Sequence, residues 1–263
     1  MRNMLIAEKI CTVDRSDLKY IQNPYGSSPT AVVQAMVGTY ATAAWTLTED
    51  ALTVVDEIYV AEHIYDFEAV TSNFNLFASR ADEMMYAVKA KLDYYVLNGL
   101  CEAGTGTYDT PAGGFTTAAN WNVILSALLS KVAGYADVYR GLFLVLENSD
   151  LVGVIQSQMA SGFNFADAAL NNGFVSNQAG VDIYVVRDST FADATIGTLG
   201  AVTNSGHRVF GVKNVATYAS PRGLQYEEKS VSAKTGKECV VVGYVGFKLW
   251  TTKASLIIDI TIK

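Results

Sequence analysis

NLFASRADEMMYAVKAKLDYYVLNGL, residues 75–100, predicts one long amphipathic helix around which the rest of the chain is arranged. Apolar residues recur every three or four positions and form one stripe, whereas Asp82 falls outside it. Asn73 or Asn75 is the expected N-cap, and we expect the helix to end near Gly99. At about 1.5 Å per residue it spans about 40 Å, more than the usual three turns. Such a helix is the spine of a flat domain or, as the alternative, a coiled-coil strand.

The segment before this helix is typical of β-structure. Residues 31–67 are rich in Val, Thr, Tyr, Trp and Ile, with Thr48-Glu49-Asp50-Ala51 as the one strong polar break. This pattern predicts a long two-stranded hairpin that turns at the break. Its second strand is apolar on both faces, so both faces must be buried to be stable in water. We expect a neighbouring subunit to bury them. Residues 1–30 are expected to form an extended arm, because Pro24, Pro29 and the Gly26-Ser27-Ser28 stretch interrupt any helix there.

The remainder of the chain mixes helix and strand patterns, which predicts the α+β class. The glycine-rich run Gly104–Gly114 is expected to be a flexible loop, since it lacks the Gly-Lys-Ser/Thr ending of a phosphate-binding loop. We expect helices over 118–134 and 150–159, and strands over 142–146, 183–186, 209–212, 224–231, 239–249 and 255–262, with a Lys234-Thr235-Gly236-Lys237 turn.

Charge divides the chain into an acidic and a basic part. Residues 20–79 contain seven acids and no Lys or Arg, whereas residues 207–263 contain nine Lys or Arg against four acids. A molecule with one acidic and one basic region can associate head to tail with copies of itself. Half of the residues are hydrophobic and only 17% are charged, which also indicates surface hidden between subunits.

Composition argues against several classes of function, among them tight nucleic-acid binding, cysteine-based metal or redox sites, and membrane spanning. The acidic pI near 4.9 argues against tight binding along nucleic acid, although a shell that encloses nucleic acid is compatible with it. Cys11, Cys101 and Cys239 match no zinc or redox spacing, so we expect reduced, buried thiols in an intracellular protein. No signal peptide is apparent, and the uncharged stretch 20–48 is too rich in Thr, Gln and Gly for a transmembrane helix.

Catalytic candidates are few. His63 and His207 are the only histidines, and a pair of His207 with Cys239 or a serine matches no known nucleophile motif. Lys234-Thr235-Gly236 resembles a β-lactamase fragment but lacks the partner motif, and Asp56-Glu57 lacks a third metal ligand. We therefore expect no enzyme activity, no metal and no cofactor.

The order of these segments resembles a tailed-bacteriophage major capsid protein of the Hong Kong 97 type. The resemblance spans the whole chain and depends on order and spacing rather than on a catalytic motif. Its most specific stretches are the helix quoted above, GVDIYVVRD (180–188), HRVFGVKNVATYASPRGLQYEE (207–228) and VVVGYVGFKLWTTKASLIIDI (240–260).

The resemblance implies a Hong Kong 97-like fold in five parts. These are an N-terminal arm (1–30), an E-loop hairpin (31–73), a P-domain spine helix with the following loop (74–111), an A-domain (112–214) and P-domain return strands (215–263). It further implies that the acidic E-loop packs on basic strands of a neighbouring subunit. The expected intersubunit contacts are Trp45, Glu49, Asp50, Leu52, Asp56, Glu57, Ile58, Tyr59, Arg222, Lys229, Lys234 and Lys237.

The implied function is self-assembly, as hexamers and pentamers, into an icosahedral virion shell around double-stranded DNA, formed in the host cytoplasm and joined by a portal. Some members crosslink an E-loop lysine to an asparagine, but residues 20–88 contain no lysine, so we expect no such bond. About thirty residues precede the hairpin, so a separate scaffolding protein, or none, is expected if Met1 is the true start. An encapsulin-type compartment and a cytosolic enzyme with an unrecognised site are the alternatives.

Overall fold

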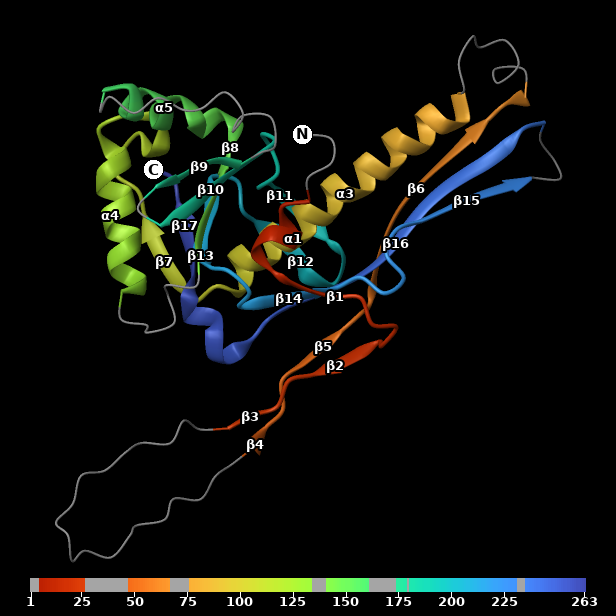
Figure 1. The fold of residues 1–263 in the computed structure, drawn as a ribbon, viewed down its shortest axis with the longest axis horizontal. Coiled ribbons are helices and arrows are strands. Elements are labelled where there is room, and N and C mark those ends of the chain that lie inside the picture. Colours follow the sequence, from red (N-terminus) through yellow and green to blue (C-terminus); the bar gives the residue numbers. More distant parts are fainter. Residues whose placement is uncertain are drawn as a thin grey trace, which may run out of the picture.

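The computed structural model describes residues 5–26, 47–66, 76–133, 141–160, 174–178, 180–230 and 235–263. The predicted long helix is confirmed as α3, Leu76–Ala103, which runs 28 residues through the centre of the molecule (Figure 1). Met84, Val88 and Leu92 are buried, as the apolar stripe predicts. α3 contacts strands of both large sheets, which is the environment of a spine rather than of a coiled-coil strand.

One sheet forms the elongated end of the molecule. β16, Lys237–Leu249, is its longest strand and changes partners along its length. Its first nine residues pair antiparallel with β6 on one edge and its first six with β15 on the other, whereas its last four pair with β14. β14 in turn pairs in parallel with β1. The strands are β1 (Thr12–Asp14), β6 (Asp56–Ile64), β14 (Ala216–Ala219), β15 (Gln225–Ser230) and β16.

A six-stranded sheet forms the other end, in the order β7-β17-β13-β8-β10-β9. β8 is buried along its whole length, because LFLVLE is apolar on both strand faces and both faces are covered. Helices α4 (Asn120–Val132) and α5 (Leu151–Ala160) lie beside this sheet (Figure 1). The strands are β7 (Gly106–Asp109), β8 (Leu142–Glu147), β9 (Phe174–Gln178), β10 (Val181–Val186), β13 (His207–Val212) and β17 (Ile257–Thr261).

The predicted turn at residues 48–51 is wrong. β4 (Leu47–Thr48) and β5 (Ala51–Thr53) both pair antiparallel with the N-terminal strands β3 (Tyr25–Gly26) and β2 (Tyr20–Gln22). β6 then pairs with β16 from the far end of the chain. The chain therefore passes straight through the polar break, because both sides of it find partners elsewhere. Residues 31–46, including Trp45, and 67–73 of the expected hairpin lie outside the described residues.

The other predicted elements are confirmed to within a few residues, with two exceptions. The glycine-rich run is not a flexible loop throughout, because β7 pairs in parallel with β17 inside it. The N-terminal segment is not only extended, since α1 (Ala7–Ile10) precedes β1. A short hairpin of β11 (Asp193–Ile196) and β12 (Gly200–Thr203) was not predicted from the sequence, nor was β14.

Candidate assembly surfaces

Four short strands project from the body as a narrow double ribbon, β2 with β5 and β3 with β4 (Figure 1). We call residues 20–26 and 47–53 the projecting strands. Their base is fixed by Asp50, whose side chain accepts the Thr251 N–H at 2.9 Å and the Lys248 ammonium at 3.0 Å. Burial alone would raise the pKa of Asp50, but these two donors hold it below its ordinary value. Asp50 is therefore an ionised anchor at neutral pH.

Leu52 completes this anchor. It is 1% exposed and packs with Val54, Ala219 and Trp250 in a small separate core. The sequence predicted that Asp50 and Leu52 contact a neighbouring subunit. In the subunit both side chains are buried against their own chain, and their contact with a neighbouring subunit stays a prediction.

Beyond the anchor, the projecting strands carry exposed apolar side chains. Tyr20 is 49% exposed and Leu47 is 56% exposed, and Leu18 at their base is also exposed. Glu49 lies among them and accepts bonds from Gln22 and, at 3.5 Å, from Tyr20. A two-stranded ribbon is marginally stable alone in water. These strands therefore present an exposed surface of apolar side chains around one carboxylate.

Asp56 joins three parts of the chain. Its carboxylate accepts the Tyr95 hydroxyl of α3 at 2.7 Å, and the Thr198 hydroxyl and N–H at 2.6 and 3.0 Å. Burial and the bond to Asp56 raise the pKa of Tyr95, which keeps it a donor. A Cβ on Gly197, at φ +43°, would lie 2.6 Å from an Asp56 oxygen. Asp56 was predicted as an intersubunit residue; within the subunit it bonds to Tyr95 and Thr198, and its contact with a neighbouring subunit stays a prediction.

The next residues of β6 alternate between two faces of the sheet. Ile58 is partly buried and packs near the Met84 and Val88 cluster under α3. Glu57 and Tyr59 point to the opposite face and are exposed, Tyr59 by 65%. They pair with Tyr244 and Val242 of β16. Glu57 and Tyr59 thus remain available for a contact with another chain.

The predicted basic partners are only partly free. Lys229 of β15 pairs with Glu227 at 2.8 Å, and Lys237, at the exposed start of β16, pairs with Glu228 at 2.9 Å. Lys234 lies outside the described residues. Arg222 is exposed at φ +61° and lies 3.9 Å from Asp17.

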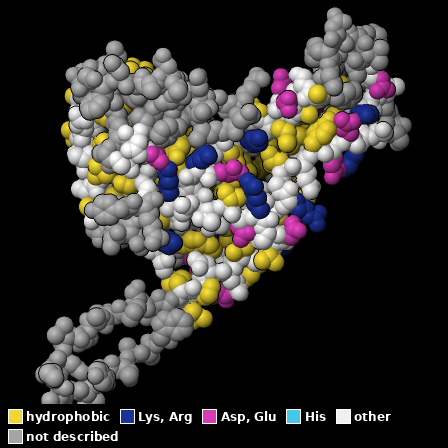
Figure 2. Space-filling view, viewed as in Figure 1, with side chains coloured by type: hydrophobic (Ala, Val, Ile, Leu, Met, Phe, Trp, Pro, Cys, Tyr) yellow, Lys and Arg dark blue, Asp and Glu magenta, His cyan; other side chains and the backbone are white. Residues whose placement is uncertain are grey.

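A groove of about 500 Å³ lies between α1, α3 and residues 218–224. Its apolar lining includes Met85, Leu92 and Leu224. Three cations line the same groove, Arg15, Lys89 and Arg222, against one carboxylate, Glu8. We call it the basic groove; Figure 2 shows Lys and Arg side chains on the face where α1 and α3 lie.

Lys89 has no ion pair among the described residues, whereas Arg15 pairs with Glu8 at 2.8 Å. Sequence reasoning missed Arg15 and Lys89 because both lie outside the basic C-terminal block. Their convergence depends on α1 and α3 meeting residues 218–224, which no local pattern reveals.

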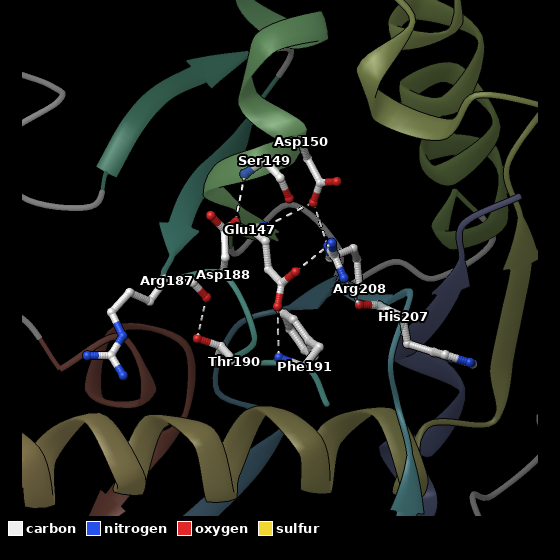
Figure 3. A network of polar contacts seen from close by, with 9 residues as sticks. All are labelled: Glu147, Ser149, Asp150, Arg187, Asp188, Thr190, Phe191, His207 and Arg208. Carbon is white, nitrogen blue, oxygen red and sulfur yellow. Dashed lines mark hydrogen bonds and ion pairs between the residues drawn. The ribbon is translucent and has the colours of Figure 1, made fainter. Parts of the chain in front are cut away.

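A second polar cluster lies inside the six-stranded sheet region (Figure 3). Arg208 of β13 is 4% exposed; its guanidinium donates to Glu147 at 2.8 Å and also pairs with Asp150. Glu147 additionally accepts the Phe191 N–H at 3.0 Å, and the Phe191 ring faces the guanidinium. The charges are paired and bonded within the chain, which is the arrangement of a structural cluster rather than of a reactive site.

The described residues bring no catalytic group together. His207 binds Asp259 at 2.8 Å in the six-stranded sheet, whereas Cys239 accepts the Tyr226 hydroxyl at 3.3 Å in the other sheet, so the considered His207–Cys239 pair does not form. His63 contacts the Thr235 carbonyl oxygen at 3.3 Å. All three cysteines are free and buried, as predicted, and burial raises the pKa of Cys11 and Cys101.

Within the described ranges there is no group of three His, Cys, Asp or Glu residues arranged to hold a metal ion. None of the helices among these residues is long and apolar enough to cross a membrane.

No family model and no curated protein sequence matches the chain. Solved structures do. The capsid of cyanophage P-SCSP1u matches with a TM-score of 0.74 and 12% identity, covering 100% of this chain and 89% of that one. The chain has the fold of tailed-phage capsid proteins. The capsid fold recurs in the mature capsid of bacteriophage PhiM1, with a TM-score of 0.72, 13% identity and coverage of 100% and 88%.

The empty GTA particle capsid also has this fold, with a TM-score of 0.72, 14% identity and coverage of 100% and 91%. The capsid fold predicted from the order of segments is thus confirmed over the whole chain. The boundaries assigned to the five parts, and the predicted intersubunit contacts, stay predictions.

Proposed function

We propose that the chain is the structural subunit of an icosahedral capsid, which assembles from hexamers and pentamers in the host cytoplasm and encloses double-stranded DNA in the virion. The observation that carries this proposal is the match of the entire chain to capsid structures. The paired charges of the interior cluster and the lack of a catalytic constellation among the described residues agree with a structural role.

The projecting strands are proposed to bind a neighbouring subunit, as expected of an E-loop. Their exposed Tyr20 and Leu47 supply apolar area, and Glu49 supplies the acid. We propose the basic groove as the acceptor in place of Lys229 and Lys237, because the groove contains Lys89, which has no ion pair among the described residues, whereas those two lysines have carboxylate partners. The groove offers an apolar lining together with three cations.

Apolar burial should contribute more than charge to the stability of this proposed contact. Covering an exposed large apolar side chain stabilises by about 1.5–3 kcal/mol, whereas an exposed ion pair contributes about 0–1 kcal/mol. Charge then sets orientation and register more than affinity. Since residues 20–88 contain no lysine, the contact is proposed to be noncovalent.

The proposal is tested by purifying the protein and imaging it by electron microscopy, with light scattering at high concentration. Closed shells that contain DNA and carry a portal support it, and copurification of a separate scaffolding protein would account for assembly. Shells with one cargo enzyme would instead support the encapsulin alternative. A discrete monomer or dimer at all concentrations would overturn the shell function and favour the cytosolic enzyme.

A further inference from the structure

Asp93 on the buried face of α3 holds the N-terminal segment. Its two carboxylate oxygens accept the Ile6 N–H at 3.2 Å and the Ala7 N–H at 2.8 Å, across 86 or more positions of sequence. Asp93 itself is 9% exposed. The Asp93 side chain on α3 therefore caps the N-terminus of α1 through these two bonds.

The N-terminal segment, residues 5–14, is otherwise held by apolar burial and by backbone bonds. Ile6, Ala7, Ile10 and Cys11 are buried in the main core. The Asn214 N–H donates to the Ile10 carbonyl at 2.8 Å, and β1 pairs in parallel with β14. Asp93 is thus a polar group at the interface between this segment and the rest of the protein, which becomes exposed to water if the segment detaches.

The Ile6 and Ala7 N–H donors favour the ionised form of Asp93, but the other groups around it do not. Glu8 of α1 is an acid, Cys11 offers a thiol, and Tyr218 of β14 offers a phenol that donates to Glu8 at 3.3 Å. The nearby cations are Arg15, which pairs with Glu8 at 2.8 Å, and Lys89, which lies four positions before Asp93 on α3. Among the described residues, Asp93 has no ion pair of its own.

We propose that Asp93 makes the attachment of the N-terminal segment to α3 sensitive to pH, tight below neutrality and looser above it. The inference concerns this interface alone and does not depend on the proposed capsid function. The geometry supplies the coupling: ionising Asp93 places a charge in a buried site beside Glu8, whereas detachment returns the carboxylate to water.

The direction follows from proton linkage. Burial is the main cause that raises the pKa of Asp93 to about 7, with Glu8 adding to it and the two N–H donors opposing it. A carboxyl exposed by detachment has a pKa of about 3.9. The attached state therefore binds the proton more tightly, and attachment weakens as the pH rises from about 4 to about 7. Between pH 5 and pH 8 we expect roughly one to two orders of magnitude in the attachment equilibrium.

Hydrogen–deuterium exchange of the full chain, read by mass spectrometry and corrected for the pH dependence of intrinsic exchange, tests the proposal. Amides of residues 6–14 should exchange at least tenfold faster at pH 8 than at pH 5, while β8 amides stay unchanged. Asp93→Asn keeps one acceptor oxygen and removes the titration, so its exchange should not vary with pH. Glu8→Gln removes a neighbouring charge and should move the midpoint to lower pH.

Two results would overturn the proposal. One is corrected exchange of residues 6–14 in the wild type that does not change between pH 5 and pH 8. The other is an equal pH dependence in Asp93→Asn. If Asp93→Asn does not fold, the shift of midpoint in Glu8→Gln decides, and an unshifted midpoint counts against the proposal.

Discussion

The cluster around Arg208 and the basic groove show two opposite ways in which this chain handles charge. In the cluster, one guanidinium and two carboxylates are buried and paired within the chain. In the groove, three cations line an apolar depression that has one carboxylate of its own, and the projecting strands expose apolar side chains around Glu49. The cluster is complete in a single subunit, whereas the groove contains Lys89 without an ion pair among the described residues, and the projecting strands leave Tyr20 and Leu47 exposed.

Removing the cation of the buried Arg208 cluster should have the largest effect on the stability of the subunit. Arg208→Met leaves Glu147 and Asp150 as buried carboxylates without their cation, and we expect a loss of about 3–5 kcal/mol in the free energy of unfolding. Denaturant unfolding measures it. The control is Arg222→Met on the exposed turn, which should stay within about 0.5 kcal/mol of the wild type. A small loss in Arg208→Met would contradict the structural role of the cluster.

The Asp56 junction should come next. Asp56→Ala removes the acceptor for Tyr95 and for both donors of Thr198, and we expect a loss of about 1–3 kcal/mol in thermal or denaturant unfolding. Glu57→Ala, one residue away on the exposed face, is the matched control and should change little. Equal losses of stability in Asp56→Ala and Glu57→Ala would show that the bonds of Asp56 do not stabilise the fold.

The anchor at Asp50 should show a distinct pH dependence. The pKa of Asp50 is lower in the folded protein than in the unfolded chain, where it is about 4. Ionised Asp50 therefore stabilises the fold above about pH 4, and this stabilisation is lost as the pH falls through the lower pKa of the folded state. Asp50→Asn should therefore cost about 1–2 kcal/mol at pH 7 and progressively less toward pH 3. Unfolding curves across this range measure it, and a constant difference would contradict the ionised anchor.

The smallest effect on subunit stability, but a large one on association, is expected at the projecting strands. Tyr20→Ser with Leu47→Ser should leave the free energy of unfolding within about 0.5 kcal/mol of the wild type. The same pair should raise the concentration at which particles form, as followed by light scattering. Val123→Ser, which is equally exposed on α4, is the control. Unchanged assembly in the double variant would remove the projecting strands from the proposed contact.

Local pattern was enough to predict α3, because its apolar stripe depends only on helical spacing, and β8, because its run is apolar on both faces. Strand pairing was not predictable in the same way. The alternation in residues 52–64 indicates a strand but not its partner, and β16 lies more than 170 positions away in the sequence.

The candidate site was harder to predict for the same reason. Asp50 and Asp56 have the pattern of solvated acids in an acidic block, yet Lys248, Thr251 and Thr198 contact them from distant segments. Arg15 and Lys89 were overlooked because charge was grouped along the sequence and not in space. The order of helices and strands along the chain predicted the fold better than the grouping of charges did, and the fold is shared with capsid proteins of only 12–14% sequence identity.

Electron cryomicroscopy of assembled particles would show whether the projecting strands bind the basic groove. The reconstruction should contain closed icosahedral shells in which the projecting strands of each subunit lie on the basic groove of its neighbour, with Glu49 near Arg15, Lys89 or Arg222. Shells in which the groove is empty and the strands contact another surface would contradict the proposed contact. Separate monomers or dimers under all conditions would contradict the shell itself.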